Sequence, residues 1–230
     1  MRLRLIVSAL ALGLVWSGDA RATDECNGLD VCISVPGPWV AVPAAARPRA
    51  QIVYYELTCP RRSVVGGLDA VRGDRSLDVR FLGALGSPVN PGITTARSVV
   101  FVVTSARRRV TYFRPVIGCI PTSGGGGRGT TGVAAPAGPP VRRVGTLRVR
   151  PGGTQRLVLR CRGGERLVGS SHAVAFRMRA APSARMLAGV IASRQERPRA
   201  VEVRARRSEA VPAGVRVEVQ VHAVCAREAS

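Results

Sequence analysis

The residues of this sequence that could do acid–base chemistry are few. Asp69, Asp74 and Asp78 follow one another at intervals of five and four residues. Three carboxylates at this spacing could line a turn that binds calcium, or supply the acid and the base of glycoside hydrolysis. Among so many arginines, however, aspartates ordinarily form turns and salt bridges, and we favour that interpretation.

Neither of the two histidines has a nucleophile suitably placed in the sequence. Ser170 and Ser171 precede His172 directly, but adjacent residues of a strand point to opposite faces. His222 lies in a run in which every second residue is valine, which places it on the polar face of a strand. No Gly-x-Ser-x-Gly motif occurs, and the chain contains no lysine for a P-loop or a Schiff base. The sequence therefore predicts no catalytic residues and no enzyme activity.

A glycine-rich stretch has the letters of a dinucleotide-binding motif without its context. Gly124, Gly126 and Gly129 have the spacing, but the motif works only where a strand enters it and a helix follows. Threonines, alanines and prolines follow here. The six cysteines include no C-x-x-C or C-x-C pair, so the usual zinc and redox spacings are missing. We therefore expect no metal site and no cofactor.

The start of the chain has the pattern of a secretory signal. Arg2 and Arg4 precede the apolar run from Leu5 to Val15, and Ala20-Arg21-Ala22 forms a small-x-small cleavage site. This pattern predicts a signal peptide over residues 1–22 and an exported protein, either secreted or retained in the cell envelope. The apolar run is well short of the roughly 20 residues that a membrane-spanning helix needs. Charges and prolines interrupt every later apolar stretch, so we expect no transmembrane anchor.

Two parts of the chain are similar to each other. Residues 37–43, GPWVAVP, and residues 145–151, GTLRVRP, both run from glycine to proline at the same spacing. In each part an apolar run then leads into a cysteine, followed by a charged turn, by Val-Val-Gly-Gly or Leu-Val-Gly-Ser, and finally by a segment that ends in a second cysteine. This similarity predicts two copies of one module.

The same similarity predicts how the cysteines pair. All six lie after residue 22, and an even number in an exported chain favours disulfides. The spacing between the two cysteines of a copy is 60 residues in the first and 64 in the second. The predicted bridges are Cys59 with Cys119, Cys161 with Cys225, and Cys26 with Cys32.

The predicted organisation places these modules in tandem. It consists of a signal peptide (1–22), a disulfide-closed lead-in (23–36), a first β repeat (37–120), a linker (121–144) and a second β repeat (145–230). The linker is rich in glycine and proline, so we expect it to be flexible. Alternation such as that from Val215 to His222 indicates half-buried antiparallel strands, and only Ala184 to Arg194 has helical character. The predicted fold class is all-β, with two small β-sandwich-like repeats.

Charge is the other strong property of the chain. Its formal net charge is +21, and 32 arginines against 13 acids remain after residue 22, a net charge of +19. The clusters are Arg61-Arg62, Arg107 to Arg109, Arg142-Arg143, Arg197 to Arg199 and Arg204 to Arg207. A surface this basic attracts anionic polymers at low salt. Side chains that could add stacking surfaces are Trp39, Tyr54, Tyr55, Tyr112 and Phe113.

The segment that follows Cys59 resembles a known type of module. Residues 59–67, Cys-Pro-Arg-Arg-Ser-Val-Val-Gly-Gly, with a closing strand that ends at Cys119, resemble uncharacterised secreted bacterial proteins with paired Cys-Pro…Val-Val-Gly-Gly…Cys repeats. The resemblance extends to the second repeat, which departs from the pattern at Arg162 and Ser170. It implies export and paired repeats, and it assigns no activity or site residue.

Three functions are therefore open. The first is a structural or binding protein of the cell envelope or the medium. The second is a polyanion-binding module, with envelope polymers or extracellular nucleic acid as partners, which predicts that the arginine clusters converge on one face. The third is a secreted hydrolase, which predicts a pocket that gathers two of Asp69, Asp74 and Asp78 with His172 or a tyrosine. The sequence leaves the ligand, the oligomeric state and the packing of the two repeats open.

Overall fold

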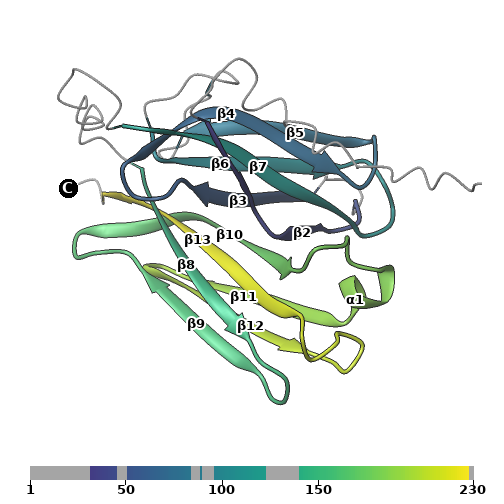
Figure 1. Cartoon of the computed structure of the whole chain (residues 1–230). Coiled ribbons are helices and arrows are strands. Elements are labelled where there is room, and N and C mark those ends of the chain that lie inside the picture. Colours follow the sequence, from purple (N-terminus) through teal and green to yellow (C-terminus); the bar gives the residue numbers. More distant parts are fainter. Residues whose placement is uncertain (1–31, 46–50, 84–88, 90–95, 123–139, 228–230) are drawn as a thin grey trace, which may run out of the picture.

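The structure is a computed structural model that describes residues 32–45, 51–83, 89, 96–122 and 140–227 (Figure 1). Its strands are β1 (Ile33–Pro36), β2 (Trp39–Val42), β3 (Ile52–Thr58), β4 (Ser63–Arg72), β5 (Leu77–Gly83), β6 (Ser98–Ser105), β7 (Thr111–Pro121), β8 (Val141–Val149), β9 (Gln155–Arg160), β10 (Glu165–Arg177), β11 (Val190–Arg197), β12 (Ala200–Arg207) and β13 (Arg216–Arg227). The one described helix is α1 (Ala184–Ala188). The predicted all-β class is confirmed. The predicted signal peptide lies outside the described residues.

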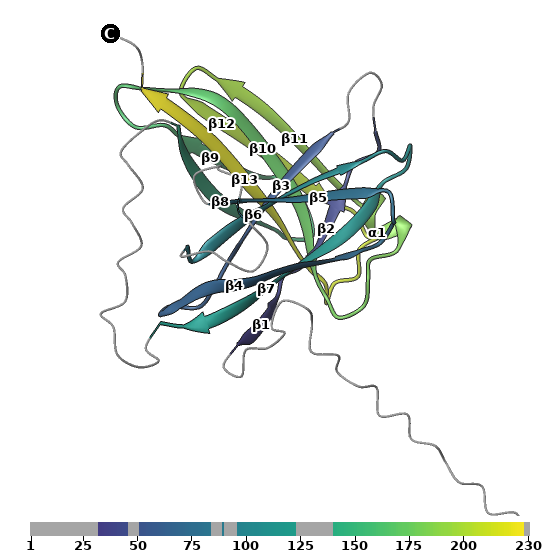
Figure 2. The same cartoon turned by 90° about the horizontal axis from the view of Figure 1, so that it is seen from above.

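The first half of the chain, β1 to β7, forms two facing sheets. One has the order β3-β6-β5. In the other, β7 pairs with β4 along one edge and with β1 and then β2 along the opposite edge, so that β7 lies between β1 and β4 (Figure 2). The alternate residues that point between the two sheets are apolar, and they include Val53, Tyr55, Phe101, Phe113 and Ile117. The first half is therefore a small sandwich with its own core.

Between β1 and β2, the chain passes close to β7 at Gly37. Its N–H donates to the carbonyl of Pro115 at 2.8 Å. A Cβ at this position would lie 2.7 Å from Cγ of Pro115, closer than real Cβ contacts come. Glycine thus allows the chain to pass very close to β7 at this point.

The second half, β8 to β13, follows the same order of pairing. Its sheets are β11-β12-β9, which we call the outer sheet, and β10-β13-β8. The ladder between β10 and β13 has a register shift between Leu167 and Gly169, and the ladder between β4 and β7 has one between Val65 and Gly67. The core of this half includes Phe176, Val203 and Val219. β8 begins at Val141, inside the segment predicted as linker, because it pairs with β13 as far as Cys225.

The two halves share one sheet. β2 pairs with β7 on one side and with β10 on the other, where Val40 faces Ala175 and Trp39 faces Phe176. The result is a seven-stranded sheet in the order β1-β7-β2-β10-β13-β8, with β4 beside β7. Figure 1 shows the first half lying over the second. Backbone hydrogen bonds therefore join the halves, a point that the sequence left open.

The helix is shorter than predicted. Ser183 caps α1 by accepting a hydrogen bond from the N–H of Met186, and the helix ends before Gly189. Val190 to Arg194 were expected to be helical but belong to β11, which pairs with β12 along its whole length. Pairing that completes a sheet outweighs a weak local preference for helix.

Two disulfides have the predicted pairing. Cys59 is bonded to Cys119, and Cys161 is bonded to Cys225. In each half the first cysteine follows an end strand of the three-stranded sheet and the second lies in the central strand of the facing sheet, so each bridge ties two layers together. Such bridges indicate an oxidising environment outside the cytoplasm. The third predicted bridge involves Cys26, which lies outside the described residues.

Candidate functional site

The three aspartates predicted for a hydrolase stay apart. Asp69 accepts a hydrogen bond from the N–H of Ala70 on β4, and Asp78 forms an ion pair with Arg80 on β5. Asp74 lies in the turn between these strands, where the N–H of Ser76 donates to it at 2.9 Å. That hydrogen bond is the main reason why the pKa of Asp74 is lowered to about 2. Asp74 also forms ion pairs with Arg107 and Arg109, which lie between β6 and β7. Each aspartate therefore has its own partners.

His222 lies on the polar face of β13 as predicted, but that face is not exposed to solvent. The imidazole is fully buried. Its Nε2 lies 2.8 Å from Oε1 of Gln220, an atom that can only accept, so Nε2 carries the proton. Its Nδ1 can then accept from Arg142 at 3.4 Å. Burial is the main cause that lowers the pKa of His222 to about 3, so the ring is neutral at physiological pH.

Strand β3 of the first half covers His222. The contact between β3 and the second half is a layer of polar side chains that we call the polar seam. It consists of Tyr55 and Glu56 of β3, Arg142 of β8, Arg177 of β10 and Glu218, Gln220 and His222 of β13. The amide of Gln220 pairs with the free backbone edge of β3: Oε1 accepts from the N–H of Glu56 at 2.6 Å, and Nε2 donates to the carbonyl of Glu56 at 2.9 Å. The side-chain amide of Gln220 thus makes the two hydrogen bonds that the backbone of a neighbouring strand would otherwise make with Glu56.

The other end of the polar seam is an ion pair. Tyr55 donates from its hydroxyl to Glu218 at 3.1 Å, and Arg177 donates to the same carboxylate at 2.9 Å. Burial, together with the charge of Glu218, raises the pKa of the Tyr55 hydroxyl well above its usual range. Hydrogen bonds from Tyr55 to Glu218 and between Glu56 and Gln220 cross from β3 to β13, so the polar seam holds the two halves in register.

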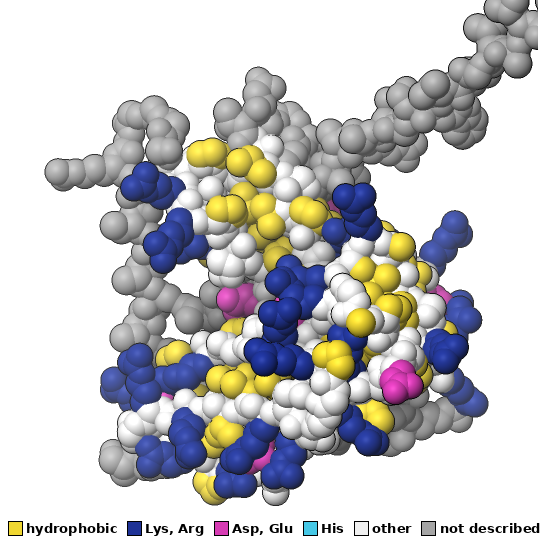
Figure 3. All heavy atoms as spheres, turned by 60° about the horizontal axis from the view of Figure 1, so that its bottom comes forward, with side chains coloured by type: hydrophobic (Ala, Val, Ile, Leu, Met, Phe, Trp, Pro, Cys, Tyr) yellow, Lys and Arg dark blue, Asp and Glu magenta, His cyan; other side chains and the backbone are white. Residues whose placement is uncertain are grey.

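The outward face of β9, β12 and β11 carries several arginines. Directly paired residues share a face of a sheet, and the registers place five arginines on the outside: Arg156, Arg160, Arg197, Arg204 and Arg206. We call these residues the arginine face. Figure 3 brings this side of the molecule forward and shows arginine side chains spread over it among hydrophobic and a few acidic side chains. Two of the predicted clusters, Arg197 to Arg199 and Arg204 to Arg207, therefore contribute to one surface.

A single carboxylate organises this face. Glu202 lies in the middle of β12 with its side chain 2% exposed, and it holds Arg204 at 2.7 Å, Arg156 at 3.1 Å and Arg197 at 3.3 Å. The hydrogen bond from Arg204 is the main cause that keeps the pKa of Glu202 below its usual range. The three guanidinium groups remain more than half exposed. One acid therefore fixes three cations in place and leaves their outer sides open to a ligand.

The aromatic side chains predicted to stack on bases lie elsewhere. Tyr55 and Phe113 are buried in the first half. Trp39 packs edge-on against Tyr112, and Tyr54 lies under the guanidinium of Arg142. The arginine face itself includes no aromatic residue on its three strands. The predicted combination of arginines with stacking surfaces is therefore not found on this face.

His172 lines a groove where β2 parts from β10. Its Nδ1 is buried and has no hydrogen-bond partner. Burial, and then the charge of Arg194, lowers the pKa of the ring. Ser170 instead donates to Glu196 at 2.6 Å, so it is not oriented toward this imidazole as a nucleophile.

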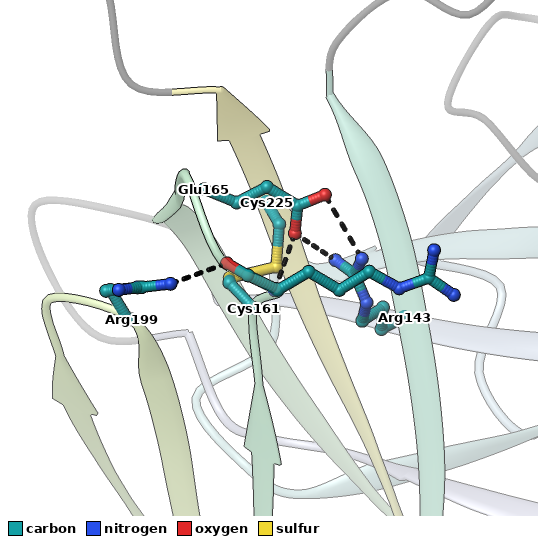
Figure 4. Close-up of a disulfide and its surroundings, with 6 residues drawn as sticks. Arg143, Cys161, Glu165, Arg199 and Cys225 are labelled. Atoms are coloured by element: carbon teal, nitrogen blue, oxygen red, sulfur yellow. Dashed lines mark hydrogen bonds and ion pairs between the residues drawn. A yellow bond between two sulfur atoms is a disulfide. The ribbon is translucent and has the colours of Figure 1, made fainter.

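The corner around the second disulfide is a structural site (Figure 4). Glu165 lies beside Cys161 and Cys225. Its carboxylate accepts hydrogen bonds from Arg143 at 3.2 Å and from the N–H of Arg162 at 2.8 Å, and it forms an ion pair with Arg143 at 2.8 Å. Ligand atoms of Cys161, Glu165 and Cys225 lie within 4.8 Å of one another. With the two sulfur atoms bonded to each other, no thiolate is free to bind a metal, and Glu165 instead ties β10 to β8.

Within the described part of the chain, no helix is long and apolar enough to cross a membrane. The resemblance to secreted bacterial repeat proteins stays a prediction. Comparison of the chain with protein-family models, with curated proteins and with solved structures found no match.

Proposed function

We propose that this chain is an exported binding protein, secreted or held in the cell envelope, which binds an anionic polymer through the arginine face. The observation that carries this proposal is the convergence of five arginines from three paired strands on one surface, organised by Glu202. Binding rather than catalysis is supported by the placement of Asp69, Asp74 and Asp78, which hold separate local partners.

The geometry of the face suits a ligand with repeating charges. Side chains two residues apart on a strand, such as Arg204 and Arg206, are roughly 7 Å apart, and neighbouring strands are about 4.8 Å apart. The guanidinium groups therefore form a two-dimensional array. Guanidinium donors match the oxygen pairs of phosphates and carboxylates, so each can make a bidentate contact with a charged group of the polymer.

The composition of the face favours a polymer that is recognised by its charged backbone. Single-stranded nucleic acid binds best where aromatic side chains stack on bases, and the three strands of this face present none. Their neutral outward residues are Val158, Ile191, Ser193, Gln195 and Ala200. An envelope polymer that carries phosphate or carboxylate groups fits this surface better than extracellular nucleic acid.

We also propose that the two halves are copies of one module, preceded by a signal peptide and joined by the linker. The recurring order of strand pairing, the register shifts at Gly67 and Gly169, and the two equivalent bridges support this. The export that this proposal assumes is supported by the two disulfides.

The test removes two cations from the arginine face and two from elsewhere. Arg160→Gln with Arg206→Gln changes the ends of the face without touching the ion pairs of Glu202. Arg72→Gln with Arg75→Gln changes exposed arginines of the first half and removes the same total charge. The probe is heparin, an anionic polysaccharide, and its dissociation constant is measured against salt concentration.

We expect the face variant to bind heparin about tenfold more weakly at low salt. Its salt dependence should become shallower by roughly 0.7 per lost contact, the slope for a single-stranded polyanion. The control variant should retain both values. Equal losses in the two variants would mean that heparin senses only the net charge. Tighter binding of single-stranded DNA than of heparin at matched charge would instead assign the face to nucleic acid.

A further inference from the structure

A groove at the junction of the two halves has no part in the proposed function. It lies where β2 ends at Val42 while β10 continues, so the shared sheet opens between Pro43 and His172. An inner cavity of about 180 Å³ and an outer cavity of about 500 Å³ share Pro43, Val53, His172 and Ala192 in their walls. The outer cavity falls within the range of about 300–1,000 Å³ that is usual for small-ligand sites.

The inner part of the groove is apolar, and so is part of its rim. Leu187, Val190 and Val174 line the inner cavity. Two of the large hydrophobic side chains that the structure exposes lie on this groove: Val110, 44% exposed, at the inner cavity and Ile52, 48% exposed, at the outer one. Apolar side chains that gather around a cavity gain contacts and lose water when an apolar ligand enters.

Polar groups stand where the two cavities meet. His172 faces both, and its buried Nδ1 has no partner. A buried donor or acceptor without a partner destabilises the structure, and a ligand that bonds to it would relieve that cost. Arg194 lies in the wall of the outer cavity with its side chain 34% exposed, donates to the carbonyl of Ser170 at 2.7 Å, and forms an ion pair with Glu196 at 3.6 Å. The apolar and the cationic parts of the groove are therefore adjacent, and the imidazole lies between them.

We propose that this groove binds a small amphipathic organic acid, with its hydrocarbon part in the inner cavity and its carboxylate toward His172 and Arg194. Ala192 and Arg194 lie on the side of β11 opposite to the arginine face, whereas Ser193, an outward residue of that face, also lines the outer cavity.

The test uses octanoate as the probe and octanol and acetate as matched compounds that each lack one half of the proposed ligand. Dissociation constants are measured by calorimetry on the full exported chain with its disulfides intact. We expect one octanoate to bind per chain, at least tenfold more tightly than octanol or acetate. Failure of octanoate to bind at millimolar concentration, or equal affinity for octanoate and octanol, would overturn the proposal.

Two surface variants locate the site. Val110→Asp places a carboxylate on the rim of the inner cavity, and Val71→Asp makes the same change at a valine of β4 that is 46% exposed. Both positions are exposed, so both variants should fold, which near-ultraviolet circular dichroism checks. We expect Val110→Asp to weaken octanoate binding about tenfold and Val71→Asp to leave it unchanged. Equal weakening would show a general charge effect and contradict the groove.

The arginine-face variant separates this proposal from the function proposed above. Arg160→Gln with Arg206→Gln should weaken heparin binding and leave octanoate binding unchanged. If that variant weakens octanoate binding as much as Val110→Asp does, octanoate binds at the arginine face and the groove proposal is wrong. A loss of heparin binding by itself bears only on the arginine face.

Discussion

The three-stranded sheets of the two halves have the same order of strand pairing, but their outward surfaces differ in charge. On β6 the residues on the side away from the core are Ser98, Val100, Val102 and Thr104, of which Val100 is fully buried, whereas at the equivalent places on β12 they are Ala200, Glu202, Arg204 and Arg206. On β5 the outward side carries Arg80 already paired with Asp78. One framework thus carries a nearly neutral surface in the first half and a basic surface in the second.

This difference shows that the arginine face is not a mere consequence of composition. Both sheets come from one chain with the same excess of arginine, and the strands of the first sheet accept threonine and valine where the second has arginine. The fold therefore does not require the cations. Their concentration around Glu202 is a property of the second sheet alone, and the following experiments test that contrast.

We expect the largest effect on stability from removing a disulfide, and we expect the same loss in both halves. Replacing Cys59 and Cys119 by alanine, or Cys161 and Cys225, removes a bridge that closes a segment of 60 or 64 residues. Each pair of substitutions should lower the free energy of unfolding by about 4 kcal/mol. Urea denaturation measures both. A large loss for one bridge and none for the other would refute the equivalence of the two frameworks.

The next effect is a pH dependence that arises in the polar seam. The pKa of His222 is about 3 in the folded protein, below its usual 6.5, so the unfolded chain binds a proton that the folded chain does not. The stability supplied by the neutral ring is complete above pH 6.5 and is lost as the pH falls toward 3, at up to about 1.4 kcal/mol per unit. His172, whose pKa is also lowered, acts in the same direction, and Glu56, whose pKa is raised by burial, acts oppositely just above its usual pKa.

Urea denaturation at pH 7 and pH 5 tests the role of His222. The wild-type chain should lose about 2 kcal/mol between these values, at 1.36 kcal/mol per unit below 6.5. His222→Gln should lose clearly less. An unchanged pH dependence in the variant would place the titrating group elsewhere.

The arginines of β12 can be introduced at the equivalent positions of β6, in the three-stranded sheet of the first half. Val102→Arg with Thr104→Arg gives β6 the residues that β12 has at Arg204 and Arg206. If charge density on a paired sheet is what binds heparin, affinity at low salt should rise about fivefold, since each added contact contributes one released counterion. The same measurement on Val71→Arg, away from this sheet, is the control. No gain in the double variant would mean that Glu202 and its fixed geometry are needed.

The smallest effect concerns the organising carboxylate. Glu202→Gln removes the negative charge to which Arg156, Arg197 and Arg204 are bonded. Heparin affinity should rise about twofold from the lost charge if the arginines stay in place, which corresponds to roughly 0.4 kcal/mol, the Coulomb energy of two unit charges about 10 Å apart in water. A fall in affinity would show instead that pre-positioning of the arginines matters more than their net charge.

Much of the fold followed from local patterns. Alternation predicted the strands because side chains of a strand alternate between faces, and the similarity of the halves predicted Cys59 with Cys119 and Cys161 with Cys225. Two predictions failed because the first treated a segment apart from its neighbours and the second assumed that one face of a strand meets solvent. Ala184 to Arg194 was expected to be a helix, and β13 was expected to be half-buried.

The amino-acid sequence by itself determined the all-β class, the two described bridges and the strongly basic character, because these depend on spacing and composition. Only the tertiary structure decided which arginines share a face, that His222 is buried under β3, and that His172 lines a groove. Each of these depends on which strands lie side by side: β9, β12 and β11 of one sheet for the arginines, and strands more than a hundred residues apart for the two histidines. That choice is made by packing and backbone pairing over the whole molecule, to which no local pattern has access.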